Sequence, residues 1–213
     1  MNKYIFSFLI IISILISSCE VINEVDSKIS QKKHLVNDIA PYNNNGELNA
    51  VIEIPAGTIE KWEVNKQTGE LDIEKISGEI RKIDYLPYPG NYGMIPQTLL
   101  PKSLGGDGDP LDIIILGPAG EKGSIVNCKL IGVLKLLDRG EQDDKLIAVQ
   151  EGTKMFQIEN IKQLDAKYFG ILNSIETWFI NYKGKGKMQP QGFGSKEEAQ
   201  SILDAAIKAY KEK

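Results

Sequence analysis

Residues 105–116 read GGDGDPLDIIIL and join a carboxylate-rich turn to an apolar run. Asp112–Leu116 is β-branched and bounded by proline and glycine, which is typical of a buried strand. Asp107, Asp109 and Asp112 place three carboxylates within six residues, and their repulsion is unfavourable unless cations compensate it. An exposed turn is the alternative, because Asp, Gly and Pro are common turn residues. This stretch alone leaves both interpretations open.

Other short β-rich runs lie on both sides of this stretch, and Gly and Pro separate them at short intervals. The candidate strands are Ala50–Pro55, Lys61–Val64, Ile125–Leu130, Ile131–Leu137 and Leu146–Val149. The C-terminal third instead has apolar residues at helical spacing. It predicts one helix over 168–182 with Asp165 as its cap, and a second that begins at Ser195 with a capping box to Glu198. The pattern predicts an α+β fold, a β-barrel with two C-terminal helices packed against it.

The N-terminus has the pattern of an export signal. Lys3 precedes the short apolar run Tyr4–Ile16, and small residues lead to Cys19. The run is too short for a membrane span of about 20 residues. Leu15–Cys19 resembles the cleavage box of bacterial lipoproteins, so we expect residues 1–18 to be removed and Cys19 to be acylated. A buried N-terminal helix, or a signal peptide that ends in a coincidental cysteine, is the alternative.

Residues 19–48 are polar and lack a sustained apolar period, which predicts a flexible tether before a folded domain at 49–213. The tether contains His34, the only histidine of the chain. The domain therefore excludes histidine–metal centres and histidine-based catalytic groups. A site made only of oxygen ligands favours Mg²⁺, Mn²⁺ or Ca²⁺. The net charge of −4 argues against a nucleic-acid partner.

A second acidic group and several cations complete the candidate site. Asp138, Asp143 and Asp144 precede Lys145 in a predicted hairpin loop. The candidate substrate cations are Lys61, Arg81, Lys145 and Lys183, and the candidate tyrosines are Tyr88, Tyr92 and Tyr182. Such a set suits a polyanion bridged by metal ions. Taken singly, the acidic group favours an exposed hairpin, and each basic residue favours an ordinary surface charge. An EF-hand is excluded, because its fifth and twelfth positions would be Leu111 and Pro118.

Gly106–Asp112 (GDGDPLD) resembles the signature of the soluble family I inorganic pyrophosphatases. Further blocks resemble this family in the same order, namely Val51–Pro55, Lys61–Glu63, Asn91–Gly93, Asp138–Lys145 and Tyr182–Lys183. The resemblance covers residues 49–194. It implies a small closed OB-like barrel and hydrolysis of inorganic diphosphate to two phosphates by a metal-activated water.

The resemblance also implies the role of each residue. Asp107, Asp112, Asp138 and Asp143 would bind two activating metals, and Glu53, with Glu63, further Mg²⁺ that arrives with the substrate. Asp109 would accept the proton of the attacking water. The diphosphate would be held by Lys61, Arg81, Tyr92, Lys145, Tyr182 and Lys183. The cofactor is several Mg²⁺ ions per site, with Mn²⁺ able to substitute.

The predicted protein is thus a pyrophosphatase that is exported and anchored to a bacterial membrane, on the periplasmic or outer-membrane side, through acylated Cys19. Family members form dimers or hexamers, and the sequence does not choose between homo-oligomers and a monomer. A surface lipoprotein that binds divalent metal or phosphate without catalysis is an alternative. Hydrolysis of an organic diphosphate is another, although no Gly-rich nucleotide loop supports it.

Overall fold

The computed structural model describes residues 32–100, 106 and 108–213. The predicted signal segment, Cys19 and Asp107 lie outside the described residues. His34–Lys213 form one compact unit. Within the described residues, no helix combines the length and apolarity needed to cross a membrane.

The compact unit begins earlier than the sequence predicted. We expected a flexible tether as far as residue 48, but Val36 and Ile39 are only 4% and 6% exposed. They pack in an apolar cluster with Val51, Val64 and Met94. Two apolar side chains in a polar segment give no periodic signal, so the sequence did not show that this part of the predicted tether packs.

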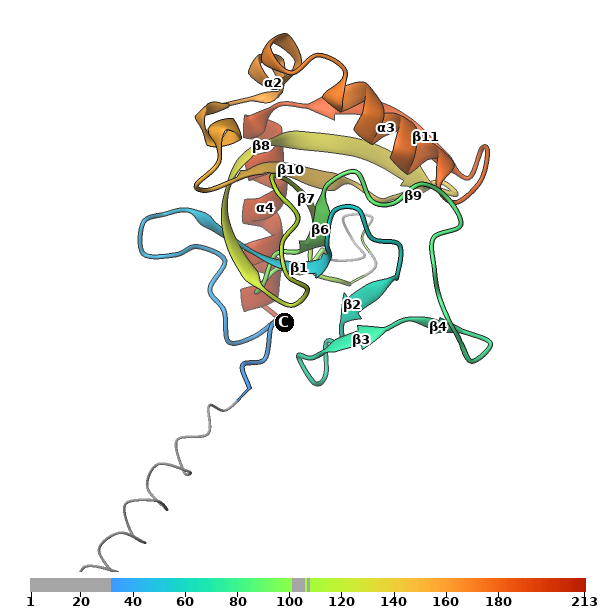
Figure 1. Ribbon diagram of the computed structural model, residues 1–213. Coiled ribbons are helices and arrows are strands. Elements are labelled where there is room, and N and C mark those ends of the chain that lie inside the picture. Colours follow the sequence, from blue (N-terminus) through green and yellow to red (C-terminus); the bar gives the residue numbers. More distant parts are fainter. Residues whose placement is uncertain (1–31, 101–105, 107) are drawn as a thin grey trace, which may run out of the picture. The chain divides into compact units, whose positions relative to one another are not determined.

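The main sheet is mixed and contains seven strands (Figure 1). Six follow the order β1 (Leu48–Ile54), β6 (Asn91–Met94), β7 (Asp112–Leu116), β10 (Lys145–Gln150), β8 (Ile125–Asp138) and β11 (Met188–Gly194), and β9 (Glu141–Gln142) pairs with β8. β1 also pairs with β8, so the order of pairings returns to its starting strand. Two small hairpins stand apart from this sheet, β2 (Trp62–Val64) with β3 (Leu71–Ile73) and β4 (Lys75–Ile76) with β5 (Glu79–Ile80).

β8 corrects the prediction of two separate strands over 125–137. It runs for 14 residues, and the predicted break at Ile131 is an irregularity in its pairing with β10. Bulges of this kind bend a strand without ending it. One end of β8 can therefore pair with β1, while the other pairs with β10 and β11.

The helices also differ from the prediction. The described residues contain α2 (Ile161–Lys167), α3 (Ile171–Asn181) and α4 (Lys196–Lys211), together with the 3₁₀ helix η2 (Lys154–Gln157). Asp165 caps none of them, because it lies inside α2, whose N-terminus is capped by Asn160. Gly170, at φ 88°, separates α2 from α3. The predicted cap of α4 is confirmed, since the Ser195 hydroxyl accepts from the Glu198 N–H.

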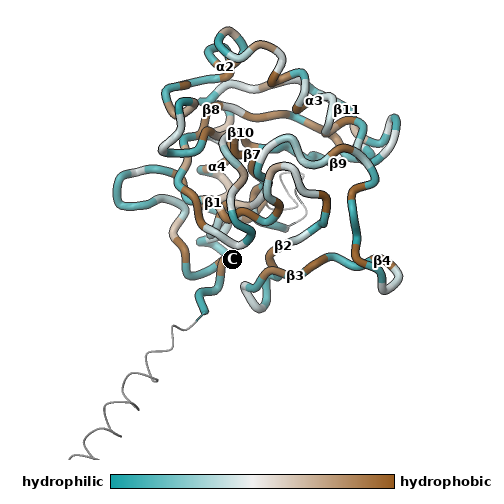
Figure 2. The backbone as a smooth tube through the Cα atoms, viewed as in Figure 1, coloured by the Kyte–Doolittle hydropathy of each residue, from teal (hydrophilic) through white to brown (hydrophobic). Residues whose placement is uncertain are grey.

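The core lies on both faces of the sheet. Ile114 of β7 packs in the cluster that includes α3, whereas Ile113 and Ile115 pack in the cluster that includes α4. This alternation is the two-residue period of a strand buried on both faces. The hydropathy colouring shows apolar segments along the central strands and hydrophilic loops outside them (Figure 2). Packing on both faces holds the strands of the sheet in place. Several of the polar side chains considered below project from the ends of these strands.

Candidate active site

Two adjoining hollows lie where β1, β7 and β10 meet the β2–β3 hairpin. We call the smaller one the cation-rich lobe. It has a volume of about 210 Å³, and its charged and tyrosine lining is Lys61, Glu63, Arg81, Tyr92, Asp109, Asp112, Asp143, Asp144, Lys145, Tyr182 and Lys183. We call the larger one the acid-rich lobe. It has a volume of about 470 Å³, and its charged lining is Glu53, Lys61, Glu63, Lys66, Asp72, Glu74, Asp109 and Asp112.

Lys145 is the central cation of the cation-rich lobe. Its side chain, at the start of β10, is only 3% exposed and contacts both Asp112 and Asp143, the latter at 2.6 Å. Burial alone would lower the pKa of Lys145, but the two carboxylates outweigh it and raise that pKa. Burial likewise acts to raise the pKa of Asp112, yet Lys145 and Lys61 bring it below its usual value. The group is therefore a charged cluster held inside the protein.

A second pair borders the same lobe. The Lys183 Nζ lies 2.8 Å from the Asp138 Oδ2 and 3.9 Å from the Asp143 Oδ2. The Asp138 Oδ1 is buried and accepts no hydrogen bond. A buried carboxylate oxygen without a partner is unfavourable, and a cation would relieve it.

These donors fit a hard divalent cation. Asp112, Asp138 and Asp143 come from β7, the end of β8 and the loop before β10, and all offer carboxylate oxygens, the ligands that Mg²⁺ prefers. Among the described residues, no three acidic, histidine or cysteine side chains form a ready metal cage. Instead, lysines compensate the carboxylates, as expected for like charges without metal. Asp107, the remaining predicted ligand, lies outside the described part of the chain.

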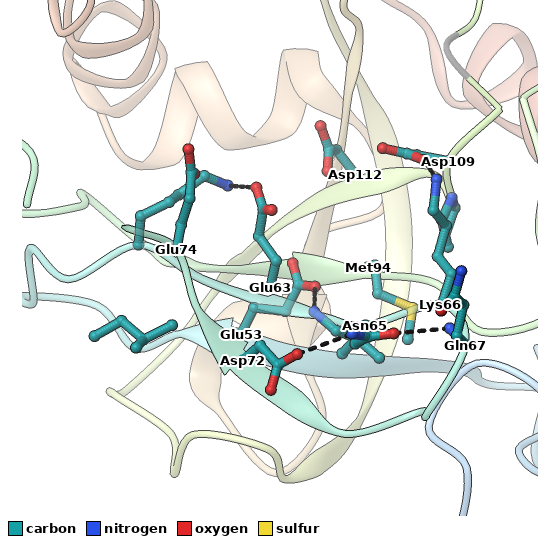
Figure 3. A pocket seen from close by; sticks show the side chains of 14 residues that line it. Glu53, Glu63, Asn65, Lys66, Gln67, Asp72, Glu74, Met94, Asp109 and Asp112 are labelled. Atoms are coloured by element: carbon teal, nitrogen blue, oxygen red, sulfur yellow. Dashed lines mark hydrogen bonds and ion pairs between the residues drawn. The ribbon is translucent and has the colours of Figure 1, made fainter. Parts of the chain in front are cut away.

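Glu53 lies at the floor of the acid-rich lobe (Figure 3). It projects from β1, is 6% exposed, and its Oε1 accepts from the Val64 N–H at 2.7 Å. Burial raises the pKa of Glu53 to about 8, against the opposing effect of Lys61. The ammonium of Lys61 lies 2.8 Å from Glu63 on the same hairpin. This single wall thus places two predicted metal carboxylates beside one predicted substrate lysine.

Asp109 lies at the edge shared by the two lobes. It is half exposed and contacts the ammonium of Lys66. A carboxylate at this edge borders both the metal-ligand candidates and the substrate cations, a position that would suit a proton acceptor. The sequence did not single out Lys66, because a lysine in a hairpin loop reads as an ordinary surface charge.

Arg81 enters the cation-rich lobe as predicted, and Glu74 holds it there. The Arg81 Nη1 donates to the Oε1 and Oε2 of Glu74 at 2.8 and 2.7 Å. Glu74, which the sequence analysis missed, is brought near by the turn of the β4–β5 hairpin. Only this backbone pairing could have identified it.

The predicted tyrosines lie between these charges and the core. Tyr92 of β6 is buried beneath Lys61, whose ammonium is 5.4 Å from the centre of its ring. Burial raises the pKa of Tyr92 well above its ordinary value, so the phenol stays protonated and can donate. Tyr182 lines the lobe at the C-terminal end of α3. The residues predicted to bind metal or substrate that the structure describes therefore line these two lobes, except Asp138, which reaches the cation-rich lobe through its ion pair with Lys183.

Comparison with known proteins decides the family. The family model for inorganic pyrophosphatase matches residues 50–211. The chain belongs to the inorganic pyrophosphatase family. It is 35% identical over 169 residues to the inorganic pyrophosphatase of Campylobacter jejuni. The matched region covers 78% of this chain and 92% of that one.

Solved structures agree. The pyrophosphatase of Schistosoma japonicum superposes with a TM-score of 0.78 at 28% identity, over 83% of this chain and 70% of that one. The enzyme of Thermus thermophilus superposes with a TM-score of 0.70 at 28% identity, over 84% of this chain and 99% of that one. The chain is accordingly a hydrolase that cleaves inorganic diphosphate, and its fold is the α+β pyrophosphatase fold.

Proposed function

We propose that the chain hydrolyses diphosphate with several Mg²⁺ ions held by Asp107, Asp112, Asp138, Asp143 and Glu53, and that Mn²⁺ can substitute. The observation that carries this assignment is the buried Oδ1 of Asp138, which accepts no hydrogen bond, while Lys183 connects Asp138 to Asp143. When bound, Mg²⁺ supplies charge neutralisation of the phosphoryl oxygens and activation of the attacking water. Of these carboxylates, Glu53, Asp112 and Asp138 belong to strands of the main sheet, which supports a preformed arrangement.

The cations of the cation-rich lobe hold the diphosphate in this proposal. Lys61, Arg81, Lys145 and Lys183 point their charges into one hollow with the hydroxyls of Tyr92 and Tyr182. Since the raised pKa of Lys145 keeps it charged, it offers a fixed cation to the phosphoryl oxygens. Phosphoryl transfer depends mainly on such positioning and charge stabilisation.

Asp109 takes the proton of the attacking water in this scheme. It lies where the acid-rich and cation-rich lobes meet, so it faces both the metal carboxylates and the substrate cations. Proton removal by a positioned carboxylate contributes about 10²- to 10⁴-fold to a rate. In this proposal Asp109 can act as the proton acceptor because it borders both lobes.

Phosphate release from diphosphate tests this assignment, measured with Mg²⁺ and with chelator. We expect rapid release with Mg²⁺ and none with chelator. Calorimetric titration of Mg²⁺ into Asp138→Asn should show weaker metal binding than in the wild type. Release that persists in chelator, or unchanged Mg²⁺ binding by this variant, would contradict the metal assignment. Mg²⁺ binding without any hydrolysis would favour the non-catalytic alternative.

We further propose that the enzyme is exported and anchored by acylated Cys19, on the pattern of residues 1–18. Growth with a labelled fatty acid should label the chain, and Cys19→Ser should abolish the label and release the protein from membranes. An unlabelled chain would contradict the anchor. The return of the strand pairings from β8 to β1 supports a closed, OB-like barrel. Homo-oligomerisation is proposed from the family alone, and light scattering tests it.

A further inference from the structure

Trp178 is a buried residue that neither the sequence pattern nor the mechanism above uses. It lies on α3 and is 4% exposed. Its indole stacks on the ring of Tyr182 with 4.6 Å between centroids and 11° between planes. Most aromatic pairs of this core are tilted or edge-on, so this near-parallel pair fixes the plane of the Tyr182 ring.

Tyr182 needs such support because the helix ends there. The Tyr182 N–H donates to the Trp178 carbonyl at 3.0 Å, the last turn of α3, and Gly184 and Gly186 follow at positive φ. The Tyr182 ring contacts the rings of Trp178 and Phe179. The position of the Tyr182 hydroxyl in the cation-rich lobe therefore depends on what its ring packs against.

The indole is in turn held by a single directed bond. Its Nε1–H donates to the Leu86 carbonyl at 2.8 Å, so the loop before β6 is tied to α3. Tyr88, from the same loop, lies 4.4 Å from the indole and 5.3 Å from the ring of Tyr92. Trp178 thus contacts Tyr182 directly and is linked to Tyr92 through the ring of Tyr88.

One side of Trp178 borders a hollow outside the active site. This hollow has a volume of about 400 Å³, and its wall includes Tyr85, Leu86 and Thr177. The indole also contacts the rings of Tyr85, Tyr88 and Phe179. Among its ring contacts, the near-parallel stack on Tyr182 is the one that leads directly to a residue lining the cation-rich lobe.

We propose that Trp178 is a positioning residue of diphosphate hydrolysis, which holds the Tyr182 hydroxyl in the substrate lobe through its stacked indole. This inference rests on the proposed role of Tyr182 in substrate binding. Trp178 touches no reacting group, so its loss should affect substrate affinity through Tyr182 and leave the metal carboxylates unchanged.

The test is a double-mutant cycle in the chain Met1–Lys213, with KM and kcat for diphosphate measured at saturating Mg²⁺. Trp178→Leu removes the stack and the N–H, whereas Trp178→Phe keeps a ring and removes only the N–H. We expect Trp178→Leu to raise KM roughly three- to tenfold, the range that aromatic pair energies give. Trp178→Phe should raise it about twofold, with smaller changes in kcat.

Tyr182→Phe should raise KM by about the same factor as Trp178→Leu, and the double variant should add little to it. Independent, multiplied effects of the two substitutions would overturn the inference. If Tyr182→Phe raises KM and both Trp178 variants do not, the inference alone is wrong. If Tyr182→Phe leaves KM unchanged, the proposed substrate role of Tyr182 fails, and the inference with it.

Two controls separate positioning from loss of fold. Phe193→Leu removes a ring from the same core cluster, and we expect a lower melting temperature with unchanged KM. Calorimetric Mg²⁺ affinity without substrate should be equal in the wild type and in Trp178→Phe, the variant that preserves most of the packing. A loss of Mg²⁺ affinity in Trp178→Phe, or an equal rise of KM in Phe193→Leu, would show a general structural effect and overturn the proposal.

Discussion

The two lobes of the active site differ in how deeply their lysine–aspartate ion pairs are buried. In the cation-rich lobe, Lys145 is buried between Asp112 and Asp143, and moving its ammonium away would leave both carboxylates without their cation. In the acid-rich lobe, Lys66 meets Asp109 with both side chains about half exposed. Buried pairs are strongly unfavourable to break, whereas exposed pairs contribute little. The first lobe therefore holds its ion pairs rigidly, as the proposed receptor for diphosphate requires, and the second has an exposed rim that can adjust.

Lys145→Met should break the comparison most strongly. Removing one partner of a buried ion pair leaves uncompensated charge, so in chelator we expect the free energy of unfolding to fall by about 3–5 kcal/mol. Urea denaturation measures this fall. Lys135→Met is the matched control, because it removes a more exposed ion pair with Glu198 and should cost below about 1 kcal/mol. Equal losses in the two variants would show that burial does not distinguish these pairs.

Asp109→Asn should separate catalysis from binding at the edge between the lobes. We expect turnover of diphosphate to fall by about 10²- to 10⁴-fold, because the amide cannot accept the proton. Mg²⁺ affinity, measured by calorimetry, should stay close to that of the wild type. Asp72→Asn, on the far wall of the acid-rich lobe, is the control and should keep nearly full turnover. Normal turnover of Asp109→Asn would refute its assignment as proton acceptor.

Glu53 gives the acid-rich lobe a pH dependence of its own. Its pKa is about 8 in the folded protein, against 4.5 for an ordinary glutamate. Between these values the folded state keeps a proton that the unfolded chain has lost, so raising the pH favours unfolding. In chelator we expect the contribution of Glu53 to the free energy of unfolding to fall by up to about 1.4 kcal/mol per pH unit across this range.

Glu53→Gln should remove this slope, because an amide does not titrate. Urea denaturation of both proteins in chelator, from pH 5 to pH 8, measures the difference. A wild-type slope that is unchanged in the variant would mean that other groups cause it.

Lys66→Met should have the smallest effect of these substitutions, and it tests whether the exposed ion pair of the acid-rich lobe contributes little. Because the ion pair with Asp109 is exposed, we expect the free energy of unfolding to change by less than about 1 kcal/mol. Turnover should change by less than about threefold, since the lysine is outside the cation-rich lobe. A loss as large as that of Lys145→Met would abolish the distinction between the lobes.

The sequence predicted the cation-rich lobe better than the acid-rich one. Asp112–Leu116 was predicted correctly as a strand, because a β-branched run between proline and glycine has few other conformations. Asp112, Lys145 and Tyr182 were named as candidate site residues because they match the family's motifs, and the structure places all three at the cation-rich lobe. The sequence missed β6 and β11, which are short or rich in glycine and proline and lack alternation. Their assignment depends on pairing with β7 and β8.

Contacts between distant segments were beyond the sequence. Glu74 reaches Arg81 through a hairpin, Trp178 reaches Leu86 across 92 positions, and the segment from His34 packs on β1 and β2. None of these leaves a periodic signal, because each depends on tertiary packing. The predicted 168–182 helix begins only at Ile171, because a left-handed turn at Gly170 precedes it, and the short helix α2 before that turn was not predicted.

The most direct test of the two-lobe account is the affinity for a non-hydrolysable diphosphate analogue, methylene diphosphonate, measured by calorimetry with Mg²⁺ present. Lys183→Met removes a cation of the cation-rich lobe, and Lys66→Met removes one that lines only the acid-rich lobe. The account predicts that Lys183→Met weakens binding by about tenfold or more and Lys66→Met by less than about twofold. Equal losses, or a larger loss in Lys66→Met, would contradict the claim that the cation-rich lobe receives the diphosphate.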